Sequence, residues 1–145
     1  MEAYSSKENK RCNYLIGETN GVYHEMAVKM GLSDSAMSIL YTICDRGESC
    51  LLKEICRQSG ISKQTVNSAI RKLEQEGIVY LKSADSKNKY VCLTDRGKEF
   101  AQGTVIRLIK AENDIFASWP KEDVDRYLEL TEKYLKDLRE KAENF

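Results

Sequence analysis

The side chains with the clearest chemistry lie between residues 62 and 72, in the sequence SKQTVNSAIRK. This segment has three basic residues and no acidic one, and its other polar residues are small hydroxyls and amides. Asn and Gln can hydrogen-bond adenine edges, Arg and Lys can bond guanine or phosphate, and Ser and Thr suit either partner. The candidate contacts are Ser62, Lys63, Gln64, Thr65, Asn67, Ser68, Arg71 and Lys72. Solvated helix faces carry the same residue types, so this segment alone leaves both a DNA contact and a bare polar surface open.

Catalytic and metal-binding chemistry has little support in this sequence. Its 145 residues include one histidine, His24, and five cysteines at positions 12, 44, 50, 56 and 92. No two cysteines form a CxxC pair, and one histidine provides little for a Cys/His zinc site or a hydrolytic triad. An odd number of cysteines does not favour a disulfide framework. We therefore expect no metal, no cofactor and no enzymatic activity.

Charge is unevenly distributed along the chain, although its formal net value is +0. Residues 1–51 have five basic and seven acidic side chains, residues 52–98 have ten and five, and residues 99–145 have eight and eleven. A basic middle segment between acidic ends favours a polyanionic partner such as nucleic acid.

Composition indicates a single globular domain over residues 1–145, with 41% hydrophobic and 32% charged residues. The apolar runs are far shorter than the about 18 residues of a transmembrane helix. The polar N-terminal sequence lacks the apolar core of a secretory signal. We expect a cytoplasmic protein with no membrane partner.

Helical periodicity organises the first half of the chain. Apolar spacings of three and four predict helices over 8–30, from 34 to about 46, over 52–59, and from Ser62 to Gly77. Gly60 suits a left-handed residue at the end of the third helix, just before the fourth. A short helix, a glycine turn and a helix with a polar outer face predict a helix-turn-helix at residues 52–76.

Two short segments rich in β-branched and aromatic residues follow, at 78–81 and 90–93. The polar segment between them, KSADSKNK, predicts a hairpin with a charged tip. Directly after a helix-turn-helix, such a hairpin is a wing, here residues 78–94, and its lysines can reach phosphate or the minor groove. The candidate contacts on it are Lys82, Lys87 and Lys89.

The last third of the sequence predicts helices. Thr94 is expected to cap a helix that continues to about residue 117, and Pro120 fits the first turn of a further helix. Apolar residues then recur at helical spacing from Val124 to Leu138.

The long helices at the two ends of the chain predict a dimer interface. One apolar stripe can pack within its own subunit, but two such helices leave more apolar surface than a small domain covers. We expect helices 8–30 and 101–142 to form this interface. The candidate interface residues are Tyr14, Val22, Tyr23, Tyr127, Tyr134 and Leu138.

Residues 32–100 resemble the MarR family of bacterial winged-helix transcriptional regulators. The similarity lies in three pieces, LSDSAMSILYTI, LLKEICRQSGISKQTVNSAIRKLEQEGIVYL and YVCLTDRGKEF. The resemblance implies a mainly α fold with a small β-hairpin wing (α+β), in which a winged helix-turn-helix is joined to N- and C-terminal dimerisation helices. It also implies a homodimer that binds a palindromic operator in double-stranded DNA, usually as a repressor, and is released by a small-molecule ligand or by oxidation.

The wing tip departs from the family pattern. Family tips often have the sequence Asp-Arg-Arg, with an arginine in the minor groove, whereas this chain has Asp85-Ser86-Lys87. Lys87 is therefore the candidate tip contact, and lysine supplies a point charge without the planar fork of arginine. We expect weaker or less width-selective contact with the minor groove.

The resemblance also suggests a place for a small-molecule effector, between the dimer helices and the DNA-binding part. The candidate lining residues are Tyr23, His24, Met37, Tyr41 and Trp119. Residues of these types are also common in protein cores and interfaces, so both interpretations remain.

Cys12 is the candidate for redox sensing. It lies near the start of the first helix beside Lys10 and Arg11, a basic setting that favours the thiolate. In peroxide-sensing relatives the cysteine position corresponds to Asn9, and Asp34 stands where a tyrosine is expected, so Cys12 is displaced from that pattern.

The other four cysteines are expected to have structural roles or none. Cys44, Cys56 and Cys92 fall on apolar faces, where small core residues are expected. Cys50 follows Glu48 and Ser49 in a predicted turn, where we expect it to be exposed and without an obvious partner.

Two classes of function therefore remain. The first is a dimeric DNA-binding regulator, with a thiol-based redox-sensing regulator as its variant. The second is a winged-helix module for protein–protein assembly, which would have aromatic or aliphatic residues across residues 62–72. The polar, acid-free sequence there favours the first.

Overall fold

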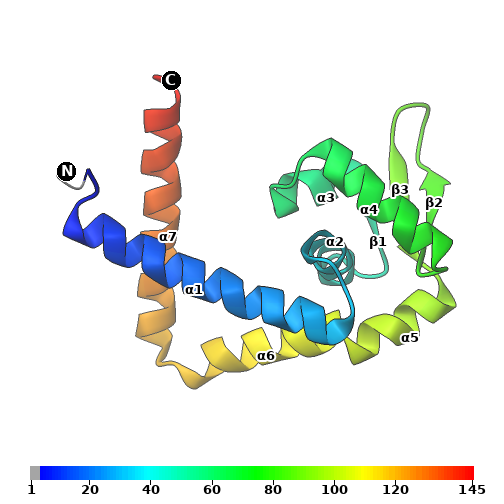
Figure 1. The fold of residues 1–145 in the computed structure, drawn as a ribbon, viewed down its shortest axis with the longest axis horizontal. Coiled ribbons are helices and arrows are strands. Elements are labelled where there is room, and N and C mark those ends of the chain that lie inside the picture. Colours follow the sequence, from blue (N-terminus) through cyan, green and yellow to red (C-terminus); the bar gives the residue numbers. More distant parts are fainter. Residues whose placement is uncertain (1–3) are drawn as a thin grey trace. The chain divides into compact units, whose positions relative to one another are not determined.

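The chain folds into two compact units, of which the first ends at Arg107 and the second is Leu108–Phe145 (Figure 1). The computed structural model describes residues 4–145. The elements are α1 (Lys7–Met30), α2 (Asp34–Asp45), β1 (Ser49–Leu51), α3 (Leu52–Ser59), α4 (Lys63–Gln75), β2 (Val79–Ser83), β3 (Lys89–Leu93), α5 (Asp95–Gly103), α6 (Val105–Ser118) and α7 (Lys121–Ala142). The described chain is mainly helical with one small antiparallel sheet, which is the predicted fold class.

The helix-turn-helix of the first unit consists of α3 and α4, with bounds close to those predicted. Gly60 ends α3 with a left-handed φ of 67°, and its N–H donates to the Cys56 carbonyl. Ser62 has extended backbone, and its hydroxyl accepts a hydrogen bond from the Thr65 N–H at the start of α4. A glycine and a serine thus end one helix and begin the next.

The core of the first unit is built around α2, which contacts α3, α4 and the sheet. The largest fully buried side chains are Ile39, Leu40, Ile43, Ile55, Val66, Leu73, Val91 and Val105. Cys56 was expected to be a core residue, but it is only partly buried, as is Leu52, and Ile55 is the buried residue of α3. This helix is only eight residues long, so its flanks stay at the surface.

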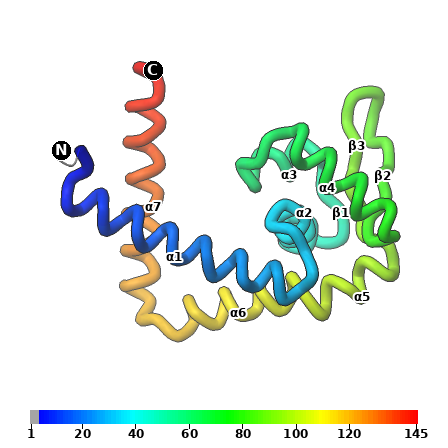
Figure 2. Tube along the Cα trace, in the orientation of Figure 1, coloured from blue at the N-terminus to red at the C-terminus, as the bar shows by residue number. Residues whose placement is uncertain are grey.

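The sheet has three strands in the order β1-β3-β2, all antiparallel. The predicted hairpin is β2 and β3, and Figure 2 shows it beside α4, with its tip at the same end of the unit as α3. The sequence did not predict β1. Its central residue, Cys50, pairs with Val91 and is 2% exposed. The expectation of an exposed Cys50 was therefore wrong, because the segment is a strand rather than a turn.

Thr94 fastens the start of α5 to the corner between α4 and β2. Its hydroxyl donates to the Gly77 carbonyl at 2.6 Å and accepts from the Gly97 N–H at 2.9 Å. Gly97 lies so close to Ile78 that a Cβ atom at this position would overlap the Ile78 carbonyl oxygen. These contacts account for the threonine and the glycine of the sequence LTDRG.

The predicted helix from Thr94 to about residue 117 is interrupted. Thr104 has φ −128° and ψ −99°, which separates α5 from α6. Its hydroxyl donates to the Phe100 carbonyl at 2.8 Å. Gly103 directly before it lowers the cost of the interruption, because glycine is a weak helix former.

The second unit contains most of α6 and all of α7. Phe116, Trp119 and Tyr127 pack against one another, with ring centroids 5.5–6.1 Å apart. Pro120 lies just before α7 with an extended ψ of 142°, one position earlier than the predicted first-turn proline. No residue of α7 is buried. Among the described helices, none has the length and hydropathy needed to cross a membrane.

Candidate nucleic-acid interface

The polar face predicted for residues 62–72 is the solvent face of α4. Val66, Ile70 and Leu73 of this helix are buried. The candidate contacts lie on the other side, where Ser62, Lys63, Gln64, Thr65, Ser68, Arg71 and Lys72 are exposed and Asn67 is partly buried. The helix therefore presents amide and basic groups to solvent while its apolar side packs against α2.

Three hydroxyls of this face are engaged by the helix itself. Ser62 donates to the Thr65 hydroxyl at 2.9 Å in addition to capping α4, and Ser68 donates to the Gln64 carbonyl at 3.1 Å. Contacts with an external partner would therefore fall mainly on the longer amide and basic side chains of α4.

The wing tip is an ordered turn built on Asp85. One carboxylate oxygen of Asp85 accepts from the backbone N–H groups of Lys87 and Asn88, at 2.8 and 2.9 Å. The other accepts from the Asn88 side-chain amide at 2.9 Å. The Asn88 amide, followed by these two N–H groups, lowers the pKa of Asp85, because hydrogen bonds to the ionised form stabilise it. Lys87 is consequently held on a fixed turn, exposed to solvent.

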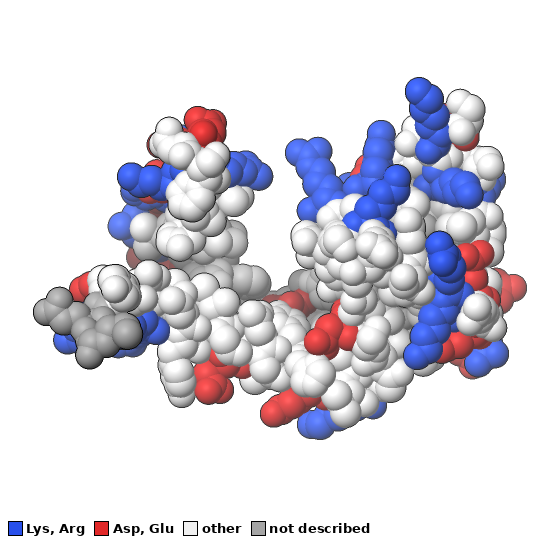
Figure 3. Space-filling model, turned by 45° about the horizontal axis from the view of Figure 1, so that its top comes forward, with Lys and Arg blue, Asp and Glu red and all other residues white. Residues whose placement is uncertain are grey.

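A groove of about 470 Å³ runs between α3, α4 and the wing. Its lining is Leu52, Lys53, Cys56, Lys63, Asn67, Lys87, Asn88 and Lys89. The fold therefore brings Lys63 and Asn67 together with the wing lysines Lys87 and Lys89. Figure 3 shows Lys and Arg side chains projecting from this end of the first unit.

Lys53 was not among the predicted contacts. It lies on α3, for which the sequence predicted no contact with a partner. The signal for it was the basic excess of residues 52–98, but that excess does not say which lysines share a surface. Only the packing of α3 beside the wing assigns Lys53 to the groove.

Lys82 was predicted beside the other wing lysines, but it does not line this groove. It lies opposite Tyr90 in the β2–β3 ladder, whereas Lys89 lies opposite Ser83. Successive side chains of a strand point to opposite faces, so Lys82 and Lys89 are on different sides of the wing. Lys82 instead lines a second hollow of about 400 Å³ with Tyr80, Tyr90 and Lys98.

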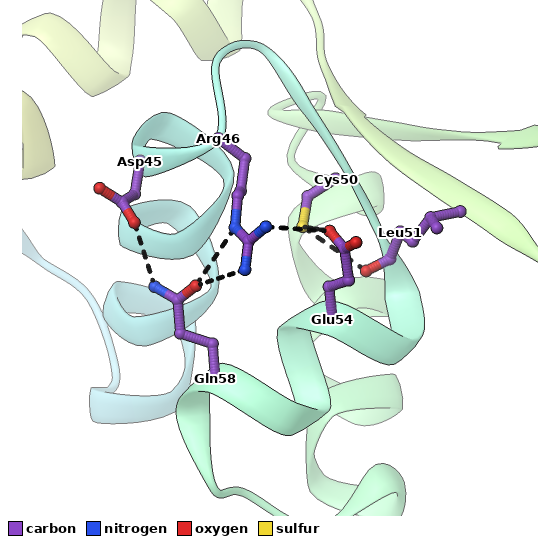
Figure 4. A network of polar contacts seen from close by, with 6 residues as sticks. All are labelled: Asp45, Arg46, Cys50, Leu51, Glu54 and Gln58. Atoms are coloured by element: carbon purple, nitrogen blue, oxygen red, sulfur yellow. Dashed lines mark hydrogen bonds and ion pairs between the residues drawn. The ribbon is translucent and has the colours of Figure 1, made fainter.

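A polar network fixes α3 to the end of α2 (Figure 4). The Arg46 guanidinium donates to the Gln58 amide oxygen at 3.3–3.4 Å and lies 3.7 Å from a Glu54 carboxylate oxygen. Gln58 in turn donates to Asp45 at 3.3 Å. The Cys50 thiol donates to Glu54 at 3.5 Å. These contacts hold the helix that carries Lys53.

The cysteines of the first unit differ in their surroundings. Burial raises the pKa of the Cys44 thiol to about 11, and burial together with Glu54 does the same for Cys50. A protonated thiol is a poor nucleophile, so neither suits redox sensing. Cys56 and Cys12 are partly exposed, and all five cysteines are free thiols. Redox sensing at Cys12 stays a prediction.

The candidate effector residues have diverse environments. Met37 is buried, whereas Tyr23 and Tyr41 are partly buried. His24 is exposed, and its Nδ1 lies 2.9 Å from the Asp34 carboxylate, which joins α1 to the start of α2. Trp119 belongs to the aromatic cluster of the second unit. An effector site at these residues stays a prediction.

The candidate dimer residues are mostly exposed. Tyr14 and Val22 on α1 are exposed, and Tyr23 is partly buried. Tyr127, Tyr134 and Leu138 on α7 are each at least half exposed. Further large apolar side chains on these helices are exposed as well, namely Leu15, Ile16, Val28, Leu128, Leu130 and Leu135.

Comparisons with known proteins identify relatives of this chain. Residues 30–87 match the sequence model of the MarR family. The uncharacterized HTH-type transcriptional regulator YwoH of Bacillus subtilis (strain 168) is 26% identical over 113 residues, which are 77% of this chain and 82% of YwoH.

Two solved structures show the same fold. The MarR-family regulator Sco3205 from Streptomyces coelicolor, in complex with DNA, has a TM-score of 0.69 at 16% identity, over 95% of this chain and 92% of its own. CouR from Rhodococcus jostii RHA1, bound to p-coumaroyl-CoA, has a TM-score of 0.72 at 19% identity, over 92% of this chain and 95% of its own.

Proposed function

We propose that the chain is a MarR-family transcriptional regulator that acts as a homodimeric repressor of a palindromic operator, and the family match at residues 30–87 and the shared fold support this proposal. In this proposal residues 52–76 are the helix-turn-helix, residues 78–94 are the wing, and the helices at 8–30 and 101–142 join two copies.

The observation that carries the proposal is the shared lining of one groove by α3, α4 and the wing. Four lysines and two asparagines line it, and no carboxylate does. Basic groups that converge from three elements suit the phosphate backbone, while the amides of α4 suit base edges. The structure of Sco3205 with DNA supports the same partner for this fold. Because the partner is DNA, we place the protein in the cytoplasm.

The dimer follows from the exposed apolar side chains of α1 and α7. Isolated exposed apolar residues are common, but a whole helix face of them marks an interaction surface. Two-fold symmetry then places two copies of α4 about one helical turn, roughly 10 bp, apart on the same side of the duplex. Two copies of α4 related by two-fold symmetry would bind two half-sites of the same sequence in opposite orientation, which is a palindromic operator.

A small molecule is proposed to release the operator. CouR, which has this fold, is seen bound to p-coumaroyl-CoA. The candidate residues in this chain remain Tyr23, His24, Met37, Tyr41 and Trp119.

Fluorescence anisotropy with DNA from upstream of the protein's own gene tests the proposal. The titration is made at two salt concentrations, with a scrambled duplex as competitor. We expect tight, competitor-resistant binding at two subunits per duplex. Binding that is weak, equal for both duplexes and abolished by salt would contradict an operator in that region. An assembly module would bind neither duplex.

A further inference from the structure

The second hollow, of about 400 Å³, lies on the face of the wing that bears Lys82. The groove that we propose for DNA lies on the other face, which bears Lys89. The lining of the second hollow is Glu48, Ser49, Tyr80, Lys82, Tyr90, Cys92, Leu93 and Lys98. Lys82 was expected to contact DNA, so its place on this face leaves a basic side chain without a role in the groove.

The strand register explains why the sheet has a hollow here. Cys92 of β3 pairs with Ser49 of β1 on one side and with Tyr80 of β2 on the other. Tyr90, two residues before Cys92, pairs with Lys82. Paired residues, and residues two apart on one strand, point to the same face of a sheet. A small thiol and a small hydroxyl therefore form the floor of the hollow, and two tyrosines and a lysine stand beside it.

Three side chains beside this floor have unengaged polar ends. The hydroxyls of Tyr80 and Tyr90 and the ammonium of Lys82 form no hydrogen bond or ion pair within residues 4–145. All three side chains are exposed. The hollow thus offers two aromatic rings, two hydroxyl donors and one cation to an external molecule.

Lys98, the other lysine of the lining, already has acidic partners. Its Nζ lies 3.0 Å from a Glu48 carboxylate oxygen and 4.0 Å from a carboxylate oxygen of Asp95. These carboxylates balance the charge of Lys98, whereas no ion pair among the described residues includes Lys82. The unbalanced charge of the lining is therefore a single positive one, at Lys82.

We infer that the second hollow is a binding site for a small planar aromatic molecule with one anionic group, whose ring packs against Tyr80 and Tyr90 and whose anion pairs with Lys82. Binding at this site requires neither DNA nor a residue of the groove, and thus goes beyond the proposed function. None of the proposed effector residues lines this hollow.

The lining favours this class of ligand over others. Aromatic rings pack edge to face or offset against other rings, which favours a planar ring over an aliphatic chain. One unbalanced cation favours one negative charge, because a second negative charge on the ligand would be repelled by Glu48. The volume of about 400 Å³ lies within the roughly 300–1,000 Å³ of small-molecule sites.

The test begins with an NMR titration of the full-length, isotope-labelled protein at neutral pH and without DNA. The probe is 2-naphthoate, which has a planar double ring and one carboxylate. As comparisons, 2-naphthol has the ring without the charge, and acetate has the charge without the ring. We expect 2-naphthoate to shift the amide signals of β2 and β3 with a dissociation constant of about 0.1–1 mM. Each comparison compound should bind about tenfold more weakly or less.

Paired variants separate the contributions of the charge and the rings. Lys82→Ala should weaken 2-naphthoate binding about three- to fivefold, whereas Lys82→Arg, which keeps the cation, should stay within about twofold of the wild type. Tyr80→Ala and Tyr90→Ala should each weaken binding about five- to tenfold. Tyr80→Phe and Tyr90→Phe keep the ring and should each weaken it less than about threefold. Lys29→Ala, which removes an exposed lysine of α1, is the charge control and should have no effect.

Thermal unfolding checks that each variant is folded. The comparison among the three probes needs no variant, so it remains decisive if an alanine variant fails to fold. Binding of acetate as tight as that of 2-naphthoate would contradict an aromatic ligand. Absence of any shift in the β2 and β3 signals up to about 10 mM 2-naphthoate would overturn the site as a whole.

The variants also distinguish this site from others on the chain. If 2-naphthoate binds but the alanine variants at Tyr80, Lys82 and Tyr90 bind it as well as the wild type, the probe occupies another place and the inference is wrong. Equal losses from Lys82→Ala and Lys29→Ala would likewise contradict it, since only total charge would then matter. These results are independent of whether the protein binds an operator, so the site and the proposed function can fail separately.

Discussion

The two units of the molecule use their apolar residues in opposite ways. In the first unit, Ile39, Leu40 and Ile43 on α2 have no exposed surface, because α3, α4 and the sheet enclose them. In the second, α7 has an equally regular apolar stripe, yet none of its residues is buried. Periodicity thus predicts that a helix has an apolar face but not what covers that face. The first unit encloses the core around α2 within one chain, whereas the apolar face of α7 is left uncovered, as is that of α1, and these are the faces that we propose join two copies.

The strongest test of this contrast compares two truncations. Ile39→Ala should lower the free energy of unfolding by about 2–5 kcal/mol, because it leaves a cavity in an enclosed core. Leu138→Ala removes a similar volume from α7 and should lower the unfolding midpoint by weakening a subunit contact, so that a higher protein concentration recovers part of the loss. Urea unfolding at two protein concentrations measures both. A large loss from Leu138→Ala that is independent of concentration would place this residue in a core of the single chain.

Gly97→Ala is expected to have the next largest effect. The new methyl group would overlap the Ile78 carbonyl, and moving backbone at the corner fastened by Thr94 should cost about 1–3 kcal/mol. Gly17→Ala is the matched control, since a Cβ there meets nothing and α1 should gain up to about 1 kcal/mol. Thermal unfolding should show a lower midpoint for Gly97→Ala and a higher midpoint for Gly17→Ala than for the wild type. Equal shifts for both variants would refute the close contact at Gly97.

Ser62→Ala should cost about 1 kcal/mol of stability, because the start of α4 loses the hydroxyl that accepts the Thr65 N–H. Ser62→Asp keeps an acceptor and should recover the loss. On DNA the same Asp adds a negative charge close to the groove, so affinity should fall while stability returns. Urea unfolding and DNA anisotropy measured on the same samples distinguish the role of Ser62 in capping α4 from a role in contacting DNA.

The effect expected only at alkaline pH, and absent near neutral pH, is a pH dependence from the Cys44 and Cys50 thiols. The pKa values of Cys44 and Cys50 are raised from 9.0 to about 11 in the folded chain. The folded state therefore keeps these protons longer than the unfolded state. Their contribution to stability is complete below about pH 9 and is lost as the pH rises towards 11. Urea unfolding from pH 8 to 11 should show that the free energy of unfolding falls more steeply with pH for the wild type than for Cys50→Ala.

Much of the first unit was predictable from local sequence. The cap at Ser62, the left-handed Gly60 and the buried face of α4 follow from residue types and spacing, and the structure has all three. The strand β1 was missed because three residues are too few to establish a period. The interruption at Thr104 was missed because the apolar pattern continues across it.

The candidate interface was predictable in composition but not in arrangement. The sequence indicates that residues 62–72 and the wing are polar and basic. Strand alternation separates Lys82 from Lys89, and the packing of α3 beside the wing adds Lys53 to the groove. Both effects depend on contacts between segments far apart in the chain, and no local pattern encodes them.

The direct passage from β1 into α3 has a mechanical consequence. No loop residue separates Leu51 from Leu52, and β1 pairs with β3, which also forms half of the wing. The wing and the first helix of the helix-turn-helix are therefore joined through the same sheet, which limits how far they can move apart. If DNA enters the gap between them as we propose, the sheet limits the width that a duplex meets, and we expect the duplex to bend or narrow in order to fit. We expect discrimination among operators to depend in part on the elastic cost of that deformation, at base pairs that no side chain touches.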